Sequence, residues 1–293
     1  MTPPASMRIL VTGADGQLGR ALRAASSLHA GHAYRFTTRL DMPIDDEARV
    51  RAVFAEWKPD LCINCAAYTA VDRAETERAE AFRINAEAVG RLAAACREAG
   101  VRLIHISTDY VFSGEARSPY REDDPTDPPS VYGASKLAGE RLALREAPES
   151  LVVRTSWVYY EEGKNFVRTM MRLMAERPSV GVVDDQWGCP THAGDLAECL
   201  LRIADGGRLT PGIYHYCNTG VITWHRFATA IRDILGSACE VRAITTAEYP
   251  TPARRPAYSV LDTGRIGEVF GIVPPPWRDS LEACMRRMRA MGA

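Results

Sequence analysis

Residues 7–19 read Met7-Arg8-Ile9-Leu10-Val11-Thr12-Gly13-Ala14-Asp15-Gly16-Gln17-Leu18-Gly19, and this stretch decides the fold. The short, largely apolar run up to Thr12 is typical of a fully buried parallel strand. A glycine-rich turn follows at once and leads into an expected helix over residues 20–28. Amides at the start of such a helix can bind a pyrophosphate, and glycines let the phosphates come close. The order strand, glycine turn, helix therefore predicts a dinucleotide site.

The glycines of this turn are spaced Gly-x-x-Gly-x-x-Gly, one residue wider at the first gap than the usual dinucleotide fingerprint. A plain tight turn is the alternative interpretation. The position after an N-terminal strand and before a helix is the context that the binding motif requires, and it favours binding. The residues of the turn that we expect to contact the cofactor are Gly13, Asp15, Gly16, Gln17, Leu18 and Gly19.

Strands and helices alternate at short intervals from residue 7 to residue 154. After the first unit, strands are expected at 34–37, 61–64, 101–107 and 151–154, and helices at 46–57, 72–98 and 132–145. We expect the long helix to begin with a capping box formed by Asp72 and Glu75. The alternation predicts an α/β fold with a doubly wound, Rossmann-like parallel sheet and ligands at the carboxyl ends of its strands.

The alternation loosens after residue 155. Helices are expected at 165–177, 193–204 and 223–235, with a strand at 212–216, and the proline-rich residues 249–256 cannot be regular structure. We predict a flexible tail over residues 1–6 and a dinucleotide-binding domain over 7–155 with a returning segment near 192–217. Residues 156–191 and 218–293 are then predicted to form a smaller α/β substrate-binding lobe.

The composition is that of an ordinary globular protein. Of the 293 residues 25% are charged, and the net charge of -1 argues against a nucleic-acid surface. We see neither a secretory signal nor a membrane span and expect a cytoplasmic protein without a membrane partner. The eight cysteines are interpreted as small core residues, and the six histidines lack ligand spacing, so no metal site is predicted.

A second motif lies in residues 101–136. An expected strand ends in Ser107-Thr108-Asp109-Tyr110, and Tyr132-Gly133-Ala134-Ser135-Lys136 opens a helix after a polar loop. Tyr132 and Lys136, four residues apart, share one helix face, where the ammonium can stabilise the phenolate of a side chain that ordinarily titrates near pH ~10. Such pairs also occur on solvated helix faces, so the surrounding motifs must decide.

These motifs together resemble the extended short-chain dehydrogenase/reductase family, and within it the dTDP-4-dehydrorhamnose reductases. The resemblance covers nearly all of the chain from Met7 onward. It is carried by residues 12–19, by Asn64-Cys65-Ala66-Ala67-Tyr68-Thr69-Ala70-Val71-Asp72, by Ser107-Thr108-Asp109-Tyr110-Val111-Phe112, by residues 131–136, by Arg154-Thr155-Ser156-Trp157-Val158-Tyr159 and by Arg254-Arg255-Pro256. The strings at 107–112 and 154–159 are the more specific ones.

The resemblance implies a reduction of a sugar 4-keto group, with a nucleotide sugar, dTDP-4-dehydro-L-rhamnose, as substrate. It implies catalytic roles for Thr108, Tyr132 and Lys136, and substrate contacts by Thr108, Asp109, Tyr132, Trp157 and Arg255. Further cofactor contacts are expected from Cys65, Ala66, Ala67 and Ser107 together with Tyr132 and Lys136. Asn85 is expected to support the lysine through water.

Related activities remain as alternatives. Sugar-nucleotide dehydratases resemble this family but carry a glutamate where Tyr110 stands, and epimerases generally lack the aspartate present here as Asp109, so a simple keto reduction fits better. Another nucleotide-sugar reductase or epimerase stays open as an alternative. A non-catalytic regulatory subunit, like that of methionine adenosyltransferase, is the alternative from a different functional class.

The cofactor is expected to be NADPH, with NADH tolerated. No acid is clearly placed after the second strand for an NAD ribose, and Arg39 stands there instead, able to pair with a 2'-phosphate. Magnesium is known from some relatives, but the sequence holds no carboxylate cluster that demands it. The oligomeric state is left open, with a homodimer as one option.

Overall fold

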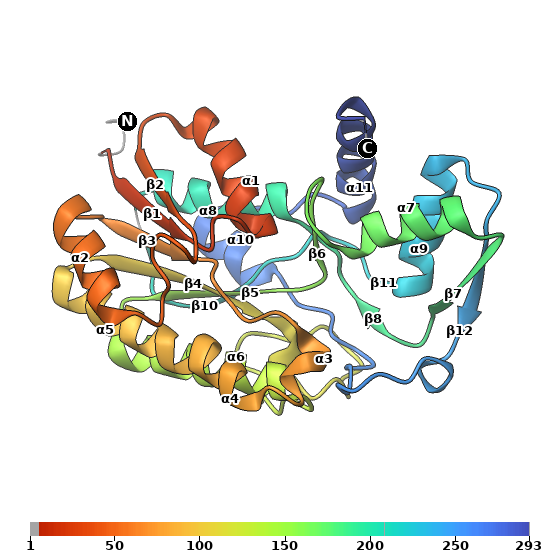
Figure 1. Ribbon diagram of the computed structural model, residues 1–293, viewed down its shortest axis with the longest axis horizontal. Helices are drawn as coiled ribbons and strands as arrows, with labels where there is room; N and C mark the ends of the chain where they lie inside the picture. The colour runs from red at the N-terminus through yellow and green to blue at the C-terminus, as the bar shows by residue number, and fades with distance from the viewer. Residues whose placement is uncertain (1–5, 208, 293) are drawn as a thin grey trace.

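The computed structural model describes residues 6–207 and 209–292, so residues 1–5 of the expected tail lie outside the described chain. Its centre is a six-stranded parallel sheet, which confirms the predicted fold class (Figure 1). Across the sheet the order is β10 (Gly212–His215), β5 (Leu151–Thr155), β4 (Arg102–Thr108), β3 (Leu61–Asn64), β1 (Arg8–Thr12) and β2 (Ala33–Thr37). The strand order changes direction between β1 and β3, which is where doubly wound folds bind nucleotides.

Helices cover both faces of the sheet because the central strands are apolar on both sides. On β1, Ile9 and Val11 pack against α1 (Gln17–Ala25), α8 (Ala193–Asp205) and α10 (Gly264–Phe270). Leu10 points the other way, toward α2 (Glu47–Trp57), α5 (Ala88–Ala99) and α6 (Val131–Glu146). This alternation is the two-residue period of a strand buried on both faces, and Figure 1 shows the two helical layers.

The helix expected over residues 72–98 is broken. It consists of α3 (Val71–Ala74), α4 (Arg78–Phe82), a π-helical turn (Arg83–Glu87) and α5. The predicted capping box is wrong, because both acids bind elsewhere: Asp72 forms an ion pair with Arg255, and Glu75 accepts a hydrogen bond from the amide of Val131 at 2.9 Å. Contacts with distant segments thus override the local capping pattern.

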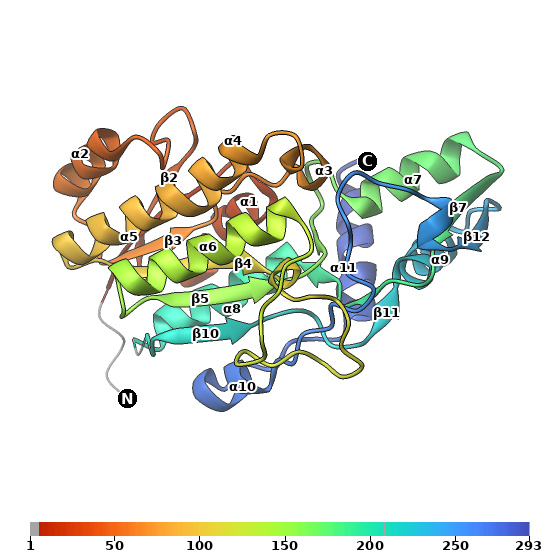
Figure 2. The same cartoon turned by 90° about the horizontal axis from the view of Figure 1, so that it is seen from below.

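The second half of the chain adds a smaller lobe beside the sheet (Figure 2). Two helices expected from the sequence are present as α7 (Phe166–Glu176) and α9 (Trp224–Leu235), and α11 (Trp277–Ala290) packs with them. The parallel pair β7 (Ser179–Val183) and β12 (Glu240–Ile244) was not predicted. Each strand is short and gains its partner only from a distant part of the chain.

Short strands and turns connect the lobe to the sheet. β6 (Val158–Tyr159) pairs with β9 (Thr191–His192), and β8 (Trp187–Gly188) pairs antiparallel with β11 (Ile222–Thr223). The remaining short elements are the 3-10 turns η1 (Ser26–His29), η3 (Asp109–Val111) and η4 (Thr246–Glu248). Residues 249–256 contain no helix or strand, as predicted.

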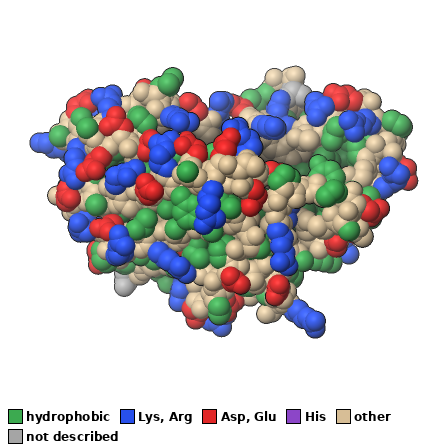
Figure 3. Space-filling model, turned by 60° about the horizontal axis from the view of Figure 1, so that its bottom comes forward, with side chains coloured by type: hydrophobic (Ala, Val, Ile, Leu, Met, Phe, Trp, Pro, Cys, Tyr) green, Lys and Arg blue, Asp and Glu red, His purple; other side chains and the backbone are tan. Residues whose placement is uncertain are grey.

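The surface offers no single-sign face in the view of Figure 3, where acidic and basic side chains are interspersed. Within residues 6–207 and 209–292, no helix is long and apolar enough to cross a membrane.

Candidate active site

A cavity of about 770 Å³ opens at the carboxyl ends of the parallel strands. Its walls come from the loops after β1, β3 and β4, from the start of α6 and from two tryptophans beyond β5. Every predicted cofactor and catalytic residue lines it: Gly13, Asp15, Gly16, Gln17, Leu18, Gly19, Arg39, Cys65, Ala66, Ala67, Ser107, Thr108, Tyr132 and Lys136. Two of the residues expected to contact substrate, Asp109 and Trp157, also line it.

The glycine turn is shaped by close backbone approaches. Gly13 has a φ of +65°, and a Cβ there would lie 2.7 Å from the amide nitrogen of Ala66. A Cβ on Gly19 would lie 2.5 Å from the carbonyl oxygen of Gly13, so only glycine lets α1 start this close to the turn. Both glycines are therefore required by the geometry, and the loops after β1 and β3 meet at the switch point of the sheet.

The start of α1 is suited to an anion. Its N-cap, Gly16, provides no side-chain hydrogen bond to the first turn, which contains no acidic residue. The first amides of a helix have no partner within the helix and carry the positive end of its dipole. A cofactor pyrophosphate fits this arrangement, since it would supply the acceptors that a capping side chain otherwise provides.

A buried polar network holds the loop after β3. Asn64 accepts a hydrogen bond from Thr12 Oγ1 at 2.6 Å and donates one to Nδ1 of His105 at 3.0 Å. The same Asn64 oxygen accepts from the amide of Ala66 at 3.2 Å. The network ties β1, β3 and β4 together just below the cavity, a role for His105 that its place in an apolar run could not reveal.

Tyr132 lies in the first turn of α6, which Ser130 caps by accepting from the amide of Gly133 at 3.2 Å. A Cβ on Gly133 would lie 2.1 Å from the carbonyl oxygen of Tyr110, so the glycine allows α6 to press against the loop after β4. The rings of Tyr110 and Tyr132 meet edge to face, with centroids 5.7 Å apart. The orientation of Tyr132 is thus fixed by packing.

The titration of Tyr132 differs from the expectation of a lowered pKa. Burial raises the pKa of Tyr132 to about 12, and the negative charge of Asp109 adds to the rise, while a hydrogen bond with Thr108 opposes it. The phenol is therefore protonated at neutral pH and available as a proton donor.

Lys136 points back to the sheet. Its Nζ donates a hydrogen bond to the carbonyl oxygen of Ile106 at 2.6 Å. Burial lowers the pKa of Lys136 to about 8, against the opposing effects of Glu140 and Cys65. Glu140 itself forms a buried ion pair with Arg154, 2.7 Å between Nη2 and Oε2. Lys136 thus remains charged near neutral pH in a largely desolvated position.

Asp109 is a buried carboxylate on the cavity wall. Thr108 Oγ1 donates to its Oδ1 at 3.0 Å, and among the described residues its Oδ2 has no hydrogen-bond partner. Burial raises the pKa of Asp109 to about 6, although the nearby hydroxyls of Thr108 and Ser259 counteract this. The hydroxyl of Ser107 is likewise buried without a partner in the described chain. Such unpaired polar atoms at a cavity are suited to a polar ligand.

Two indoles form the wall on the side of the smaller lobe. Trp157 was predicted, whereas Trp224 was missed, because a tryptophan at the start of a helix in the other lobe carries no sequence signal for this site. The rings are stacked, with centroids 3.5 Å apart and planes 10° from parallel.

Known proteins are similar to this chain in sequence and in fold. The sequence model of the family described as RmlD substrate binding domain matches residues 7–290. The dTDP-4-dehydrorhamnose reductase of Aggregatibacter actinomycetemcomitans is 42% identical over 285 residues, covering 94% of this chain and 97% of that protein. The chain belongs to the dTDP-4-dehydrorhamnose reductase family.

Further similar proteins include one named for a biosynthetic role and two with solved structures. The spore coat polysaccharide biosynthesis protein SpsK of Bacillus subtilis is 43% identical, with 94% of this chain and 95% of SpsK covered. A crystal structure of the reductase from Clostridium acetobutylicum superposes with a TM-score of 0.93 at 38% identity, covering 97% and 100% of the chains. The Bacillus anthracis reductase, solved in complex with NADP, gives 0.91 at 36%, covering 96% and 99%.

Three predicted residues have contacts or an exposure that the sequence did not specify. Arg255 does not line the cavity and instead binds both carboxylate oxygens of Asp72, each at 2.9 Å. Asn85 bonds directly to the main chain of Tyr68 and to Ser135, and its support of Lys136 through water stays a prediction. Arg39 lies at the rim, with 79% of its side chain exposed.

One group of potential metal ligands lies outside the cavity walls. Glu161, His192 and Cys284 are buried with their ligand atoms within 4.8 Å of one another. Glu161 accepts hydrogen bonds from His192 at 3.2 Å and from Arg287, so these side chains already form an ion network. Burial lowers the pKa of His192, but hydrogen bonds with Asp195, Cys284 and Glu161 raise it to about 11.

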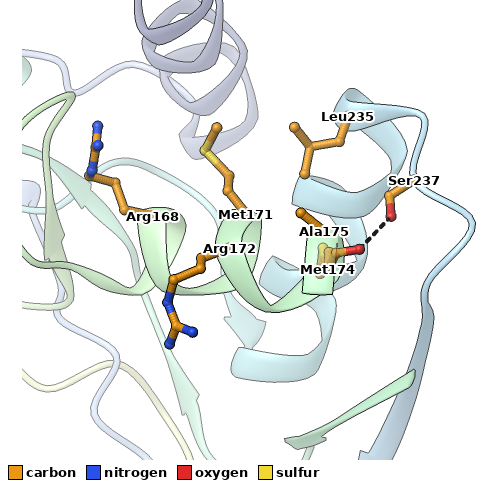
Figure 4. A pocket seen from close by; sticks show the side chains of 7 residues that line it. All are labelled: Arg168, Met171, Arg172, Met174, Ala175, Leu235 and Ser237. Carbon is orange, nitrogen blue, oxygen red and sulfur yellow. Dashed lines mark hydrogen bonds between the residues drawn. The ribbon is translucent and has the colours of Figure 1, made fainter. Parts of the chain in front are cut away.

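A second cavity, about 460 Å³, lies between α7 and the end of α9 (Figure 4). It is mostly apolar and shares no wall residue with the first cavity; its lining is Arg168, Met171, Arg172, Met174, Ala175, Leu235 and Ser237. It contains none of the predicted site residues.

Proposed function

We propose that the protein reduces the C4 keto group of dTDP-4-dehydro-β-L-rhamnose to a hydroxyl, with NADPH as reductant, and so forms dTDP-β-L-rhamnose, a polysaccharide precursor. The observation that carries the proposal is that Thr108, Tyr132 and Lys136 line one cavity together with the glycine turn of residues 13–19. We assign residues 7–155, with a return near 192–217, to cofactor binding, and residues 156–191 and 218–293 to substrate binding.

A bound reduced nicotinamide supplies the hydride that forms the new C–H bond at C4. The protonated phenol of Tyr132 gives its proton to the ketone oxygen, and the charged Lys136 stabilises the phenolate that remains. The Thr108 hydroxyl turns from Asp109, to which it donates in the free protein, and donates a hydrogen bond to the same oxygen as negative charge develops there. One hydride and one proton are thus consumed for each ketone reduced, and solvent reprotonates Tyr132 after product release.

The glycine turn binds the pyrophosphate of the cofactor with the amides of Gln17 and Leu18 at the start of α1, since no side chain caps this helix. The small residues Cys65, Ala66 and Ala67 leave room for the ribose and ring at the end of β3. Asp109 and Trp157 contact the deoxysugar: the carboxylate binds a hydroxyl, and the indole covers an apolar face. Arg255 reaches the diphosphate side of the substrate only by leaving Asp72.

NADPH is proposed over NADH because the rim of the cavity carries Arg39, and a related reductase binds NADP. An exposed guanidinium raises the affinity for NADPH by pairing with the 2'-phosphate of this cofactor. The substitution Arg39→Ala should raise KM for NADPH about tenfold and leave KM for NADH unchanged. Arg145→Ala, which removes a similarly exposed arginine outside the cavity, is the matched control. Equal effects of Arg39→Ala on both cofactors would contradict this assignment.

The main experiment mixes purified protein with NADPH and dTDP-4-dehydro-L-rhamnose. Loss of absorbance at the reduced-nicotinamide band, with formation of dTDP-L-rhamnose by chromatography, is the expected result. If NADPH is not oxidised and the protein binds tightly to another enzyme, the regulatory-subunit alternative replaces the reductase proposal.

A further inference from the structure

Trp157 has an unusual backbone for a large side chain. Its φ is +47°, and within residues 6–207 and 209–292 the only other non-glycine residue with a positive φ is Lys58, which ends α2. A bulky residue in the left-handed region is strained and persists only when its surroundings hold it. Something in the fold therefore holds the indole of Trp157 in place.

The holding contacts come from a single ribbon. Trp224 stacks on the Trp157 ring at 3.5 Å, and a Cβ on Gly188 would lie 2.6 Å from Cε2 and Cζ2 of the same ring. Gly188 belongs to β8, and Trp224 directly follows β11, its antiparallel partner, in which Ile222 pairs with Gly188. Both contacts with the Trp157 indole therefore come from this pair of strands.

The ribbon itself is anchored. Thr223 caps α9 by accepting from the amide of Arg226 at 3.2 Å, and its hydroxyl donates to Asp184. Arg226 in turn lies over the ring of Trp187, 5.4 Å from its centroid. Trp224, the first residue of α9, therefore has little freedom to move away from Trp157.

We infer that Trp224 and Gly188 are specificity-determining positioning residues, which hold the indole of Trp157 as a rigid platform for the apolar face of the deoxysugar. The inference rests on the proposed function, because it deepens the role of Trp157 there. Both indoles line the cavity with Thr108 and Tyr132. A platform fixed before binding lowers the entropy cost of ordering it around the sugar.

The platform affects the position of the bound sugar more than it affects the rate of proton transfer. Trp224→Ala removes the stacking partner and should raise KM for the nucleotide sugar about tenfold, with a much smaller change in kcat. Gly188→Ala places a methyl group against the Trp157 ring and should raise the same KM. Trp224→Phe retains an aromatic partner and should restore most of the affinity. KM for NADPH should stay unchanged in all three variants.

The matched control is Trp277→Ala. Trp277 packs edge to face on Phe227 in the same lobe and does not line the cavity. Its loss should lower the melting temperature at least as much as Trp224→Ala without raising KM for the sugar. If Trp224→Ala and Trp277→Ala raise KM equally, or if Trp224→Phe fails to recover what Trp224→Ala loses, the inference is overturned.

Calorimetric binding of dTDP-L-rhamnose separates this inference from the proposed function. If the wild-type protein binds the nucleotide sugar but does not turn it over, the proposed reaction fails, and the Kd values of the variants still decide about the platform. If wild-type protein turns over and the variants keep their KM, the reaction stands and the platform is wrong. If wild-type protein neither binds nor reacts, both are wrong.

Discussion

The ammonium of Lys136 donates a hydrogen bond to the main-chain carbonyl of Ile106, with 2.6 Å between Nζ and O. The charge is thereby fixed beside the end of β4, two residues before Thr108. Because the position is desolvated, the pKa of Lys136 falls to about 8. Enzyme assays can be run on both sides of this pH.

This position predicts the pH dependence of the reaction. In the proposed mechanism the ammonium stabilises the Tyr132 phenolate below the pKa of Lys136, and above this pKa the charge is lost. We therefore expect kcat/KM to fall with rising pH above about pH 8, approaching tenfold per pH unit. Lys136→Arg keeps its charge throughout this range, so its residual activity should lack that decline. A Lys136→Arg profile that declines at the same pH would assign the titration to another group.

Tyr132→Phe removes only the hydroxyl that we propose as the proton donor. Turnover should drop about 100-fold to 10,000-fold, while NADPH affinity and the melting temperature stay near wild type. Tyr159→Phe is the control, since the Tyr159 hydroxyl is buried, has no partner in the described chain and lies outside the cavity walls. Steady-state assays of both variants decide the matter, and full activity of Tyr132→Phe would remove Tyr132 as the acid.

Gly13→Ala should damage both stability and cofactor affinity. The new methyl group meets the amide of Ala66 at 2.7 Å in a backbone that already has a φ of +65°. Gly100→Ala separates the two causes, because Gly100 has a φ of +69° but no atom within 4 Å of the added Cβ. Gly100→Ala should cost only about 1 kcal/mol of the free energy of unfolding.

NADPH titrations by fluorescence provide the second readout for this pair. Gly13→Ala is expected to weaken binding more than about tenfold, whereas Gly100→Ala should bind like wild type. Equal losses of stability in both variants would mean that the loops after β1 and β3 can move apart freely.

Asp109 predicts a pH-dependent stability. Its folded-state pKa is about 6 against 3.8 in the unfolded chain, so the folded protein retains a proton that the unfolded chain releases between these values. The free energy of unfolding should therefore decrease as the pH rises from about 4 to about 6, by up to about 3 kcal/mol from this group.

Denaturant unfolding of Asp109→Asn across the same range tests the assignment. Residue 109 of the variant cannot ionise. The free energy of unfolding of the variant minus that of wild type should therefore increase as the pH rises and become constant above about pH 6. A difference between the two proteins that does not change with pH would show that Asp109 does not titrate in this range.

The sheet and the meeting of the predicted residues at one cavity could be predicted because their signals are local. The apolar strand before Gly13 specifies a buried parallel strand, and the glycines cannot be exchanged where backbones approach closely. Tyr132 and Lys136 belong to one helix, so their proximity follows from helical spacing. These residues line one cavity, as expected.

Features that depend on distant partners could not be predicted. Asp72 and Glu75 have the spacing of a capping box, yet Arg255 and the amide of Val131 bind them instead. Trp224 reaches the cavity only because β11 pairs with β8. The raised pKa of Tyr132 follows from the desolvation of its position, which helical spacing alone does not reveal.

The π-helical turn of residues 83–87 lies between α4 and α5, and because of it the two helices differ in phase. One extra residue in a turn rotates everything beyond it by roughly 100° around the axis. If residues 78–99 are substituted one by one and the stability is measured, the sensitive positions should therefore follow two separate helical periodicities, one on each side of the turn. Deleting one residue within the turn would merge them and swing Asn85 away from Tyr68 and Ser135.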